Sequence, residues 1–379
     1  MTLDSKSFVL AQEVDTPSLL LDLDIFESNM LALLKICQSH GVSLQPHAKT
    51  HRTPEIGRLQ QDLGADGLCV AKVGEAEGFA EVGVRKITVA YPVLGKSKIE
   101  RALNLARRVD LTLGVDSVIG AREIGEVFAA EGMTCKLLLI IDTGPQRDGV
   151  LPSVAPDVAT EISAIPGVRL DGIMTHEGTV YASANPQELE QASQAVATLM
   201  VETAQSIRAK GVDLPRVSMG ASASARFVAK VPGVTQIRPG IFAFNDLGQV
   251  ALGNATLDQV AVRVLTTVVS RPSPTSAVID GGSKTFSQDL LPAAAHRSEY
   301  PGHGLIIGKP GWVIERLSEE HGMVRFMGTG NPPNLDIGEK VQVIPNHICT
   351  VFSSLNECVV LRSGKVQAFW RTFAPGASR

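Results

Sequence analysis

The sequence has 379 residues, of which 44% are hydrophobic and 4% aromatic, and its formal net charge is −4. This length is enough for one large domain and one smaller domain, each with its own core. Dispersed charge and few aromatic side chains argue against a nucleic-acid-binding protein, which needs clustered lysines and arginines and stacking platforms. An enzyme is the class that fits best.

The five cysteines are widely separated and lack CxxC spacing, so no disulfide framework is expected. No stretch approaches the roughly 20 continuous apolar residues that a membrane span requires. The first 17 residues have no apolar core of the kind that signal peptides carry. We therefore expect a cytoplasmic protein that has no contact with a membrane.

From Pro17 to about Asp246, short apolar runs alternate with segments of helical periodicity, such as residues 25–40. Apolar runs separated by helices are typical of a parallel sheet that is buried on both faces. The candidate strands are residues 17–23, 42–47, 67–72, 87–92, 110–116, 136–142, 168–176, 215–220 and 234–242. A closed barrel takes eight such strands, and no GxGxxG follows the first run. We predict an α/β barrel over residues 21–250, with residues 1–20 forming a strand that pairs with the C-terminal part.

After about residue 255 the pattern changes to β-branched runs that are broken by Gly, Pro and Asn. This pattern predicts an antiparallel β domain over residues 255–379, without helices of any length. The segment "RSGK" at 362–365 is expected to form a hairpin turn.

Polar residues follow five of the predicted barrel strands. Lys49 and His47, in "QPHAKTHR", follow the second run, and Arg147, in "IDTGPQRDG", follows the sixth. "THEG" (175–178), "SMGASASA" (218–225) and "RPGIFAFND" (238–246) follow the next three. Catalytic groups of a parallel barrel gather at the carboxyl ends of its strands. Each residue taken alone is more readily explained as part of a solvated loop, but five such ends on one rim predict an active site.

Two of these strand ends suit an anionic group. Backbone N–H groups of the small turn "SMGASASA", with Ser222 and Ser224, match the needs of a phosphate, and Gly240 allows a second close approach of the backbone. Together with Lys49, they predict a phosphorylated aldehyde cofactor held as a Schiff base, for which pyridoxal phosphate is the candidate.

A further motif lies in the C-terminal part, in "PNHICT" at 345–350. On a strand, His347 and Cys349 point to the same face. Imidazole and thiolate favour Zn²⁺, and two protein ligands leave the shell open, as in catalytic metal sites. The alternative is a buried free cysteine beside a hydrogen-bonded histidine.

The segments "DTPSLLLDLD" (15–24), "PHAKTH" (46–51), "RPGIFAFND" and "PNHIC" together resemble the fold-type III, alanine-racemase-like pyridoxal enzymes that act on D-β-hydroxy amino acids. That group contains D-threonine aldolases, D-serine dehydratases and D-threo-3-hydroxyaspartate dehydratases. The resemblance extends from Asp15 to about Trp370. It implies an α/β barrel that carries the cofactor, a C-terminal β domain and a head-to-tail homodimer.

The resemblance also implies roles for individual residues. Lys49 matches the Schiff-base lysine and Arg147 an arginine near the cofactor ring, while Arg238 matches the arginine that faces the ring nitrogen in alanine racemases. His176 is expected to orient the substrate or the leaving water, or else to be a hydrogen-bonded structural histidine. The phosphate would be lined by Ser222, Ser224, Gly240 and Ile241, and a divalent metal, Zn²⁺ or alternatively Mn²⁺ or Mg²⁺, would be bound by His347 and Cys349.

Two positions distinguish reactions within this group. Its aldolases typically have H-x-D-P-T at the metal and A-Y-x-G at the strand end, whereas its dehydratases have H-x-C and T-H-x-G. This chain has His347 and Cys349 at the first motif, and Thr175, His176 and Gly178 at the second. Both positions favour dehydration of D-serine, D-threonine or D-threo-3-hydroxyaspartate to a 2-oxo acid and ammonia.

In the expected mechanism, Lys49, made reactive by burial and by cationic neighbours, abstracts the α-proton. The metal polarises the β-hydroxyl so that it leaves as hydroxide. Two alternatives remain: a D-threonine aldolase, and a non-catalytic pyridoxal-phosphate-binding barrel. The turns that contain Lys284 and Glu319, Glu320 and His321 also resemble the group's pattern, but neither is given a role.

Overall fold

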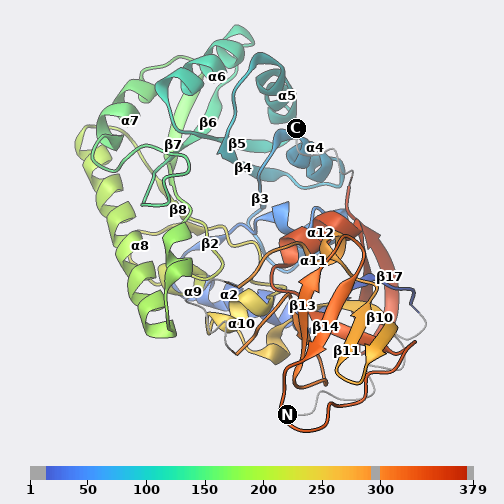
Figure 1. The fold of residues 1–379 in the computed structure, drawn as a ribbon. Coiled ribbons are helices and arrows are strands. Elements are labelled where there is room, and N and C mark those ends of the chain that lie inside the picture. The colour runs from blue at the N-terminus through green and yellow to red at the C-terminus, as the bar shows by residue number, and fades with distance from the viewer. Residues whose placement is uncertain (1–13, 292–298, 374–379) are drawn as a thin grey trace. The chain divides into compact units, whose positions relative to one another are not determined.

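The structure is a computed structural model that describes residues 14–291 and 299–373. Its contacts divide the chain into two compact units (Figure 1). The barrel unit contains residues 31–181, 187–240 and Phe373, and the C-terminal unit contains residues 14–30, 182–186 and 241–372. Compact units are not the same as independent domains, so the predicted boundaries at 20, 250 and 255 stay a prediction.

The barrel unit is built on an eight-stranded parallel sheet in the order β2-β9-β8-β7-β6-β5-β4-β3. All of its strands come from predicted runs. They are β2 Ser43–Leu44, β3 Leu68–Val70, β4 Lys86–Pro92, β5 Asp110–Val115, β6 Cys135–Ile140, β7 Val168–Met174, β8 Arg216–Met219 and β9 Gln236–Ile237. The central strands are buried on both faces, as residues 137–140 of β6 show with 5% exposure or less.

The two ends of this sheet are joined by an isolated parallel bridge between His47 and Cys69. The Cys69 N–H donates to the Pro46 carbonyl at 2.9 Å, just beyond the end of β2. The strands therefore run around the ring in sequence order, as a barrel of β-α units requires. The prediction of an α/β barrel with eight parallel strands is confirmed.

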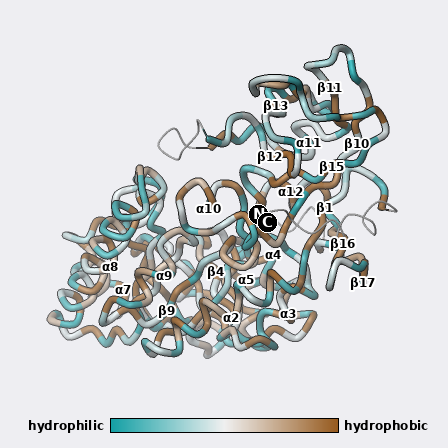
Figure 2. The backbone as a smooth tube through the Cα atoms, turned by 90° about the horizontal axis from the view of Figure 1, so that it is seen from below, coloured by the Kyte–Doolittle hydropathy of each residue, from teal (hydrophilic) through white to brown (hydrophobic). Residues whose placement is uncertain are grey.

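Helices connect the barrel strands and lie outside them in Figure 1. They include α3 Pro54–Asp62, α4 Val73–Glu81, α5 Lys96–Ala106, α6 Val118–Ala130, α7 Ala155–Ser163, α8 Pro186–Ala209 and the short α9 Ala225–Val228. Helix α2 (Leu23–Ser39) covers most of the periodic segment predicted at 25–40. In Figure 2, α7 and α8 carry both apolar and polar residues along their length, as amphipathic helices against a sheet do. No helix in the described part of the chain is long and apolar enough to cross a bilayer.

The amino ends of the barrel strands carry ion pairs. Lys86 lies 2.7 Å from Asp66, and Lys136 lies 2.6 Å from Asp110. These side chains are about one third exposed or more, so each pair contributes at most about 1 kcal/mol. This end of a parallel barrel serves stability, and catalytic groups are expected at the other end.

The C-terminal unit is built on a nine-stranded sheet in the order β11-β14-β13-β12-β15-β10-β1-β16-β17. All its neighbouring strands are antiparallel except β1 and β16. The strands are β1 Ser18–Asp22, β10 Val262–Ser273, β11 Ser276–Ile279, β12 Leu305–Ile306, β13 Trp312–Leu317, β14 Gly322–Phe326, β15 Lys340–Ile344, β16 Glu357–Arg362 and β17 Lys365–Arg371.

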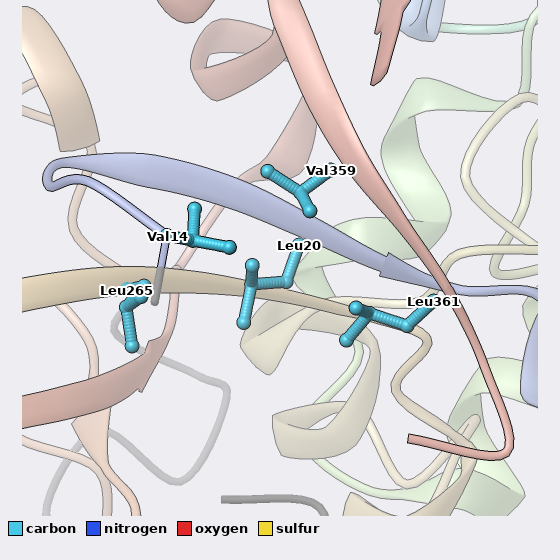
Figure 3. Close-up of a cluster of buried hydrophobic side chains, with 5 residues drawn as sticks. All are labelled: Val14, Leu20, Leu265, Val359 and Leu361. Atoms are coloured by element: carbon cyan, nitrogen blue, oxygen red, sulfur yellow. The ribbon is translucent and has the colours of Figure 1, made fainter. Parts of the chain in front are cut away.

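The first strand, β1, lies between β10 and β16, and both of these strands are far from β1 in the sequence. Its Leu20 packs in a buried cluster with residues from both neighbours. Figure 3 shows the side chains of this cluster, which are Val14, Leu20, Leu265, Val359 and Leu361. Burial of this apolar cluster explains why β1 pairs here rather than in the barrel.

The "RSGK" turn is confirmed, because Ser363 and Gly364 have φ of 50° and 72° and join β16 to β17. The prediction of no helices is wrong. Helix α12 spans Ile348–Leu355 and the short helix α11 spans Ser283–Phe286, both within the predicted β domain, whereas α10 (Leu247–Ala251) precedes it.

Candidate active site

Lys49 lies in a single 3-10 turn, Ala48–Thr50, directly after β2. His47 precedes this turn in an extended conformation, and its Nδ1 accepts the Lys49 N–H at 3.4 Å. The His47 N–H in turn donates to the Pro239 carbonyl at 2.9 Å. These contacts fix the backbone of Lys49 between two strand ends. The Lys49 side chain itself is exposed, so the expected contribution of burial to its reactivity is not found.

The segment after Lys49 is held from several sides. Arg52 has a φ of 47°, which is unusual for a residue other than glycine. Its Nε donates to the fully buried Glu75 at 2.8 Å, and Glu75 also accepts the Ala71 N–H at 2.7 Å. The Arg52 carbonyl accepts the Phe373 N–H at 2.9 Å. These partners offset the cost of the left-handed conformation.

A cavity of about 370 Å³ opens at the carboxyl ends of the barrel strands. It is lined by residues that follow most strands of the ring, so the predicted convergence of the strand ends is found. Its lining residues are His47, Lys49, Ala71, Ala90, Tyr91, Pro92, Arg147, Asp148, His176, Gly220 and Arg238. The predicted residues Lys49, Arg147, His176 and Arg238 are thus brought together.

Positive charge dominates this cavity. Burial and then the charges of Lys49 and Arg238 lower the pKa of His47 well below its usual range. Burial likewise lowers the pKa of His176 to about 4, assisted by the same charges and by Arg147. Both imidazoles are therefore neutral at pH 7, while the cavity keeps its cations. Such a field favours an anionic ligand.

The tautomer of His176 follows from its contact with Gly220. The Nδ1 atom of His176 lies 2.7 Å from the Gly220 carbonyl oxygen, which can only accept a hydrogen bond. A neutral imidazole must therefore carry its proton on Nδ1, and its Nε2 is left as a hydrogen-bond acceptor. His176 is hydrogen-bonded and also lines the cavity. It can therefore be a structural histidine and still contact the substrate or the leaving water.

Arg238 is buried and locked in one orientation. Its Nε donates to the Ser218 hydroxyl and its Nη2 to the Thr175 carbonyl, both at 2.7 Å. Gly220 approaches the guanidinium so closely that a Cβ there would lie 2.9 Å from Nη2. A larger residue at position 220 would displace the arginine from the cavity wall.

The predicted phosphate residues make contacts among themselves. The Ser222 hydroxyl accepts the Gly240 N–H at 3.1 Å. A Cβ at Gly240 would lie 2.7 Å from the Thr50 hydroxyl, so the turn after Lys49 already explains why glycine is needed there. The Ser224 hydroxyl is fully buried, and its one proton lies between Glu177 at 3.2 Å and the Ala221 carbonyl at 3.3 Å. This hydroxyl is therefore not available to donate a hydrogen bond directly to a phosphate.

Glu177 is a residue that the sequence analysis missed. Its carboxylate is fully buried directly after β7, where it also accepts the Gly220 N–H at 2.8 Å. The available signal was an acid between His176 and Gly178 at the end of an apolar strand. Its partners could not be read from the sequence.

The metal motif and Ile241 lie in the C-terminal unit. The prediction that His347 and Cys349 lie on a strand is wrong. Strand β15 ends at Ile344, and His347 immediately precedes helix α12. The start of this helix, rather than strand alternation, brings the two side chains into contact. Ile241 is buried, and its carbonyl accepts the N–H groups of Phe244 and Asn245 at 2.8 Å.

Asp246, also missed, organises the same helix start. Its carboxylate accepts the Ile348 N–H at 3.1 Å and lies 3.5 Å from Nδ1 of His347. Burial of His347 opposes protonation, but hydrogen bonds with Asp246 and Cys349 outweigh it and raise the pKa of the imidazole. A metal ion bound by His347 would have to replace a proton on this ring, because a ligating imidazole must be neutral.

The donor set fits the expected divalent metal. Within residues 14–291 and 299–373, no group of three or more His, Cys, Asp and Glu side chains is arranged as a metal site. The chain thus offers the predicted pair, with Asp246 as a carboxylate that orients the histidine, a common arrangement behind metal-binding imidazoles. The remaining positions would be left to water or substrate.

Comparisons with known proteins agree with this architecture. Residues 21–247 match the family described as alanine racemase, N-terminal domain, and residues 261–361 match the putative serine dehydratase domain. D-threonine aldolase from Arthrobacter sp. is 31% identical over 97% of this chain and 94% of its own length. D-threo-3-hydroxyaspartate dehydratase from Delftia sp. (strain HT23) is 29% identical, over 94% of this chain and 97% of its own length.

Solved structures extend the similarity to three dimensions. D-threonine aldolase from Filomicrobium marinum superposes with a TM-score of 0.88 at 29% identity, over 97% of this chain and 98% of the other. The Delftia dehydratase gives 0.88 at 28% identity, over 96% of this chain and 99% of the other, and a variant of a D-threo-3-hydroxyaspartate dehydratase is known in a metal-free form. The chain therefore belongs to the alanine racemase N-terminal domain family, with a C-terminal part of the putative serine dehydratase type.

Proposed function

We propose that this protein is a lyase that uses pyridoxal phosphate and a divalent metal, for which we expect Zn²⁺, to convert D-β-hydroxy amino acids to a 2-oxo acid and ammonia. The observation that carries the proposal is the cavity at the strand ends, where Lys49, Arg147, His176 and Arg238 converge. The similarity to a D-threo-3-hydroxyaspartate dehydratase over nearly the whole chain supports it.

Lys49 would hold the cofactor through its amine, with Arg147 near the cofactor ring and Arg238 facing the ring nitrogen. When bound, pyridoxal phosphate supplies a ring that stabilises negative charge at the α-carbon. The Lys49 amine then takes the α-proton, because its turn is fixed between two strand ends. The Nε2 atom of His176 accepts a hydrogen bond from the substrate or from the departing water, since Nδ1 is committed to Gly220.

His347 and Cys349 would hold the metal, which would supply Lewis-acid assistance to the β-hydroxyl. Cys349 is the residue that favours dehydration, because a soft thiolate ligand suits a zinc ion that assists loss of hydroxide. We also propose a homodimer, as the family resemblance implies, and a small-molecule D-amino acid as the only partner besides the cofactors.

The second candidate is retro-aldol cleavage, which the similarity to a D-threonine aldolase favours. D-threonine separates the two reactions, because dehydration yields 2-oxobutanoate and ammonia whereas cleavage yields glycine and acetaldehyde. We expect 2-oxobutanoate as the main product of the protein loaded with pyridoxal phosphate and Zn²⁺. Predominance of acetaldehyde would establish the aldolase. In the Lys49→Ala variant, borohydride should trap no cofactor and either product should disappear.

A further inference from the structure

Glu177 is a fully buried acid of the barrel unit that the proposed mechanism does not use. It has no exposed surface, and no lysine or arginine lies within salt-bridge distance of it in the described part of the chain. Burying an acid without such a partner is costly. Two donors of one turn and the charge of Arg238 offset part of this cost, although burial still raises the pKa of the Glu177 carboxyl to about 7.

The turn in question is 220–224, between β8 and α9. The Gly220 N–H donates to one oxygen of Glu177 at 2.8 Å, and the Ser224 hydroxyl donates to the other at 3.2 Å. The two donors are four residues apart, so a single side chain spans the whole turn. Loss of one buried partner would leave the opposing donor unsatisfied and free the turn to move.

Gly220 is also held on its other side. Its carbonyl accepts from Nδ1 of His176 at 2.7 Å, and its Cα packs against the Arg238 guanidinium. His176 and Glu177 are adjacent in sequence at the end of β7. His176 thus binds the carbonyl of Gly220, and Glu177 binds its N–H. The position of Gly220 is therefore set by a residue that lines the cavity and by one that lies behind it.

We infer that Glu177 is a positioning residue that fixes the turn 220–224 for recognition of the cofactor phosphate. This inference rests on the proposed function, since it takes pyridoxal phosphate as the ligand of the cavity. Ser224 then contributes through Glu177 and not through a hydroxyl–phosphate bond. The Ser224 hydroxyl is assigned this indirect role because it is buried and already forms a hydrogen bond with Glu177.

The test compares two aldehydes that both react with Lys49, pyridoxal phosphate and pyridoxal, which lacks the phosphate. The ratio of their affinities is measured by absorbance titration, with borohydride trapping to identify Lys49 as the attachment site. Glu177→Gln keeps the shape but offers one acceptor oxygen instead of two. We expect the preference for pyridoxal phosphate to fall about threefold in this variant and tenfold or more in Glu177→Ala.

Asp171→Asn is the matched control, because it alters another buried acid on β7 that pairs with Arg169 and Arg216 and lines a different pocket. Its ratio should equal that of the wild type. An unchanged ratio in Glu177→Gln overturns the inference, even where Glu177→Ala does not fold. A wild-type protein that attaches neither aldehyde to Lys49 would instead overturn the proposed function.

Discussion

Individual histidines near the cavity are kept neutral by burial. His51, two residues after Lys49, is the clearest example, since burial lowers its pKa to about 3. Its Nδ1 accepts the Thr53 N–H at 3.0 Å, and this bond requires an unprotonated nitrogen. Protonation would break the contact that starts α3.

The consequence is an acid-sensitive fold. Between pH 6.5 and 3 the unfolded chain binds a proton at His51 that the folded chain does not, so stability falls as the pH decreases through this window. His51→Asn retains an acceptor for Thr53 and removes the titration. From pH 7 to pH 4.5 we expect this variant to lose about 2 kcal/mol less stability than the wild type in urea unfolding.

His40→Asn provides the comparison, because His40 is an exposed histidine at the end of α2. It should show the same loss of stability as the wild type over that pH range. Equal losses in all three proteins would mean that His51 is protonated in the folded state.

At the scale of elements, the segment after β17 supports the lysine turn. The Phe373 ring packs on Phe79 with centroids 4.7 Å apart, and a Cβ at Gly78 would lie 2.9 Å from it. Its N–H holds the carbonyl of Arg52, the strained residue behind Lys49. We expect Phe373→Ala to cost about 1 kcal/mol of stability and to slow attachment of pyridoxal phosphate to Lys49 severalfold.

Phe369→Ala is the control for this element, since Phe369 is another phenylalanine of the C-terminal segment but 57% exposed on β17. Rates of attachment are followed by stopped-flow absorbance, and stability by thermal unfolding. Phe373→Tyr should restore the rate. If Phe373→Ala lowers stability but attaches the cofactor at the wild-type rate, the ring stabilises the fold without positioning Lys49.

The elements also show what the sequence could reveal. Apolar runs such as 136–142 are predictable as strands because burial on both faces demands them. The segment 348–355 is not, because its β-branched residues suit a strand as well. Its buried Ile348, Val351 and Phe352 do follow helical spacing, and Asn356 ends the helix with φ of 57°.

The candidate site divides in the same way. Lys49, Arg147, His176 and Arg238 could be predicted, because each follows a strand and strand ends of a barrel share one rim. Glu177 and Asp246 could not, because their roles depend on N–H donors from segments 43 and 102 residues away. The exposure of Lys49 could not be predicted from the sequence either, because the segments that pack around a turn determine how much of it contacts solvent.

At the scale of the whole molecule, the proposed cofactor and metal are assigned to different compact units. Lys49 belongs to the barrel unit, whereas His347 and Cys349 belong to the C-terminal unit. Removal of the metal should therefore abolish turnover of D-threonine while the absorbance of cofactor attached to Lys49 is retained. Cys349→Ala should reproduce this result.

Added Zn²⁺ should restore the chelated wild type but not Cys349→Ala, because that variant lacks the thiolate. Cys358→Ala, which alters a buried cysteine of β16, should remain fully active and responsive to Zn²⁺. Undiminished turnover after chelation, with metal content verified by elemental analysis, would exclude the metal from the reaction. A protein that binds the cofactor but turns over no D-amino acid at any metal load would be a non-catalytic pyridoxal-phosphate carrier.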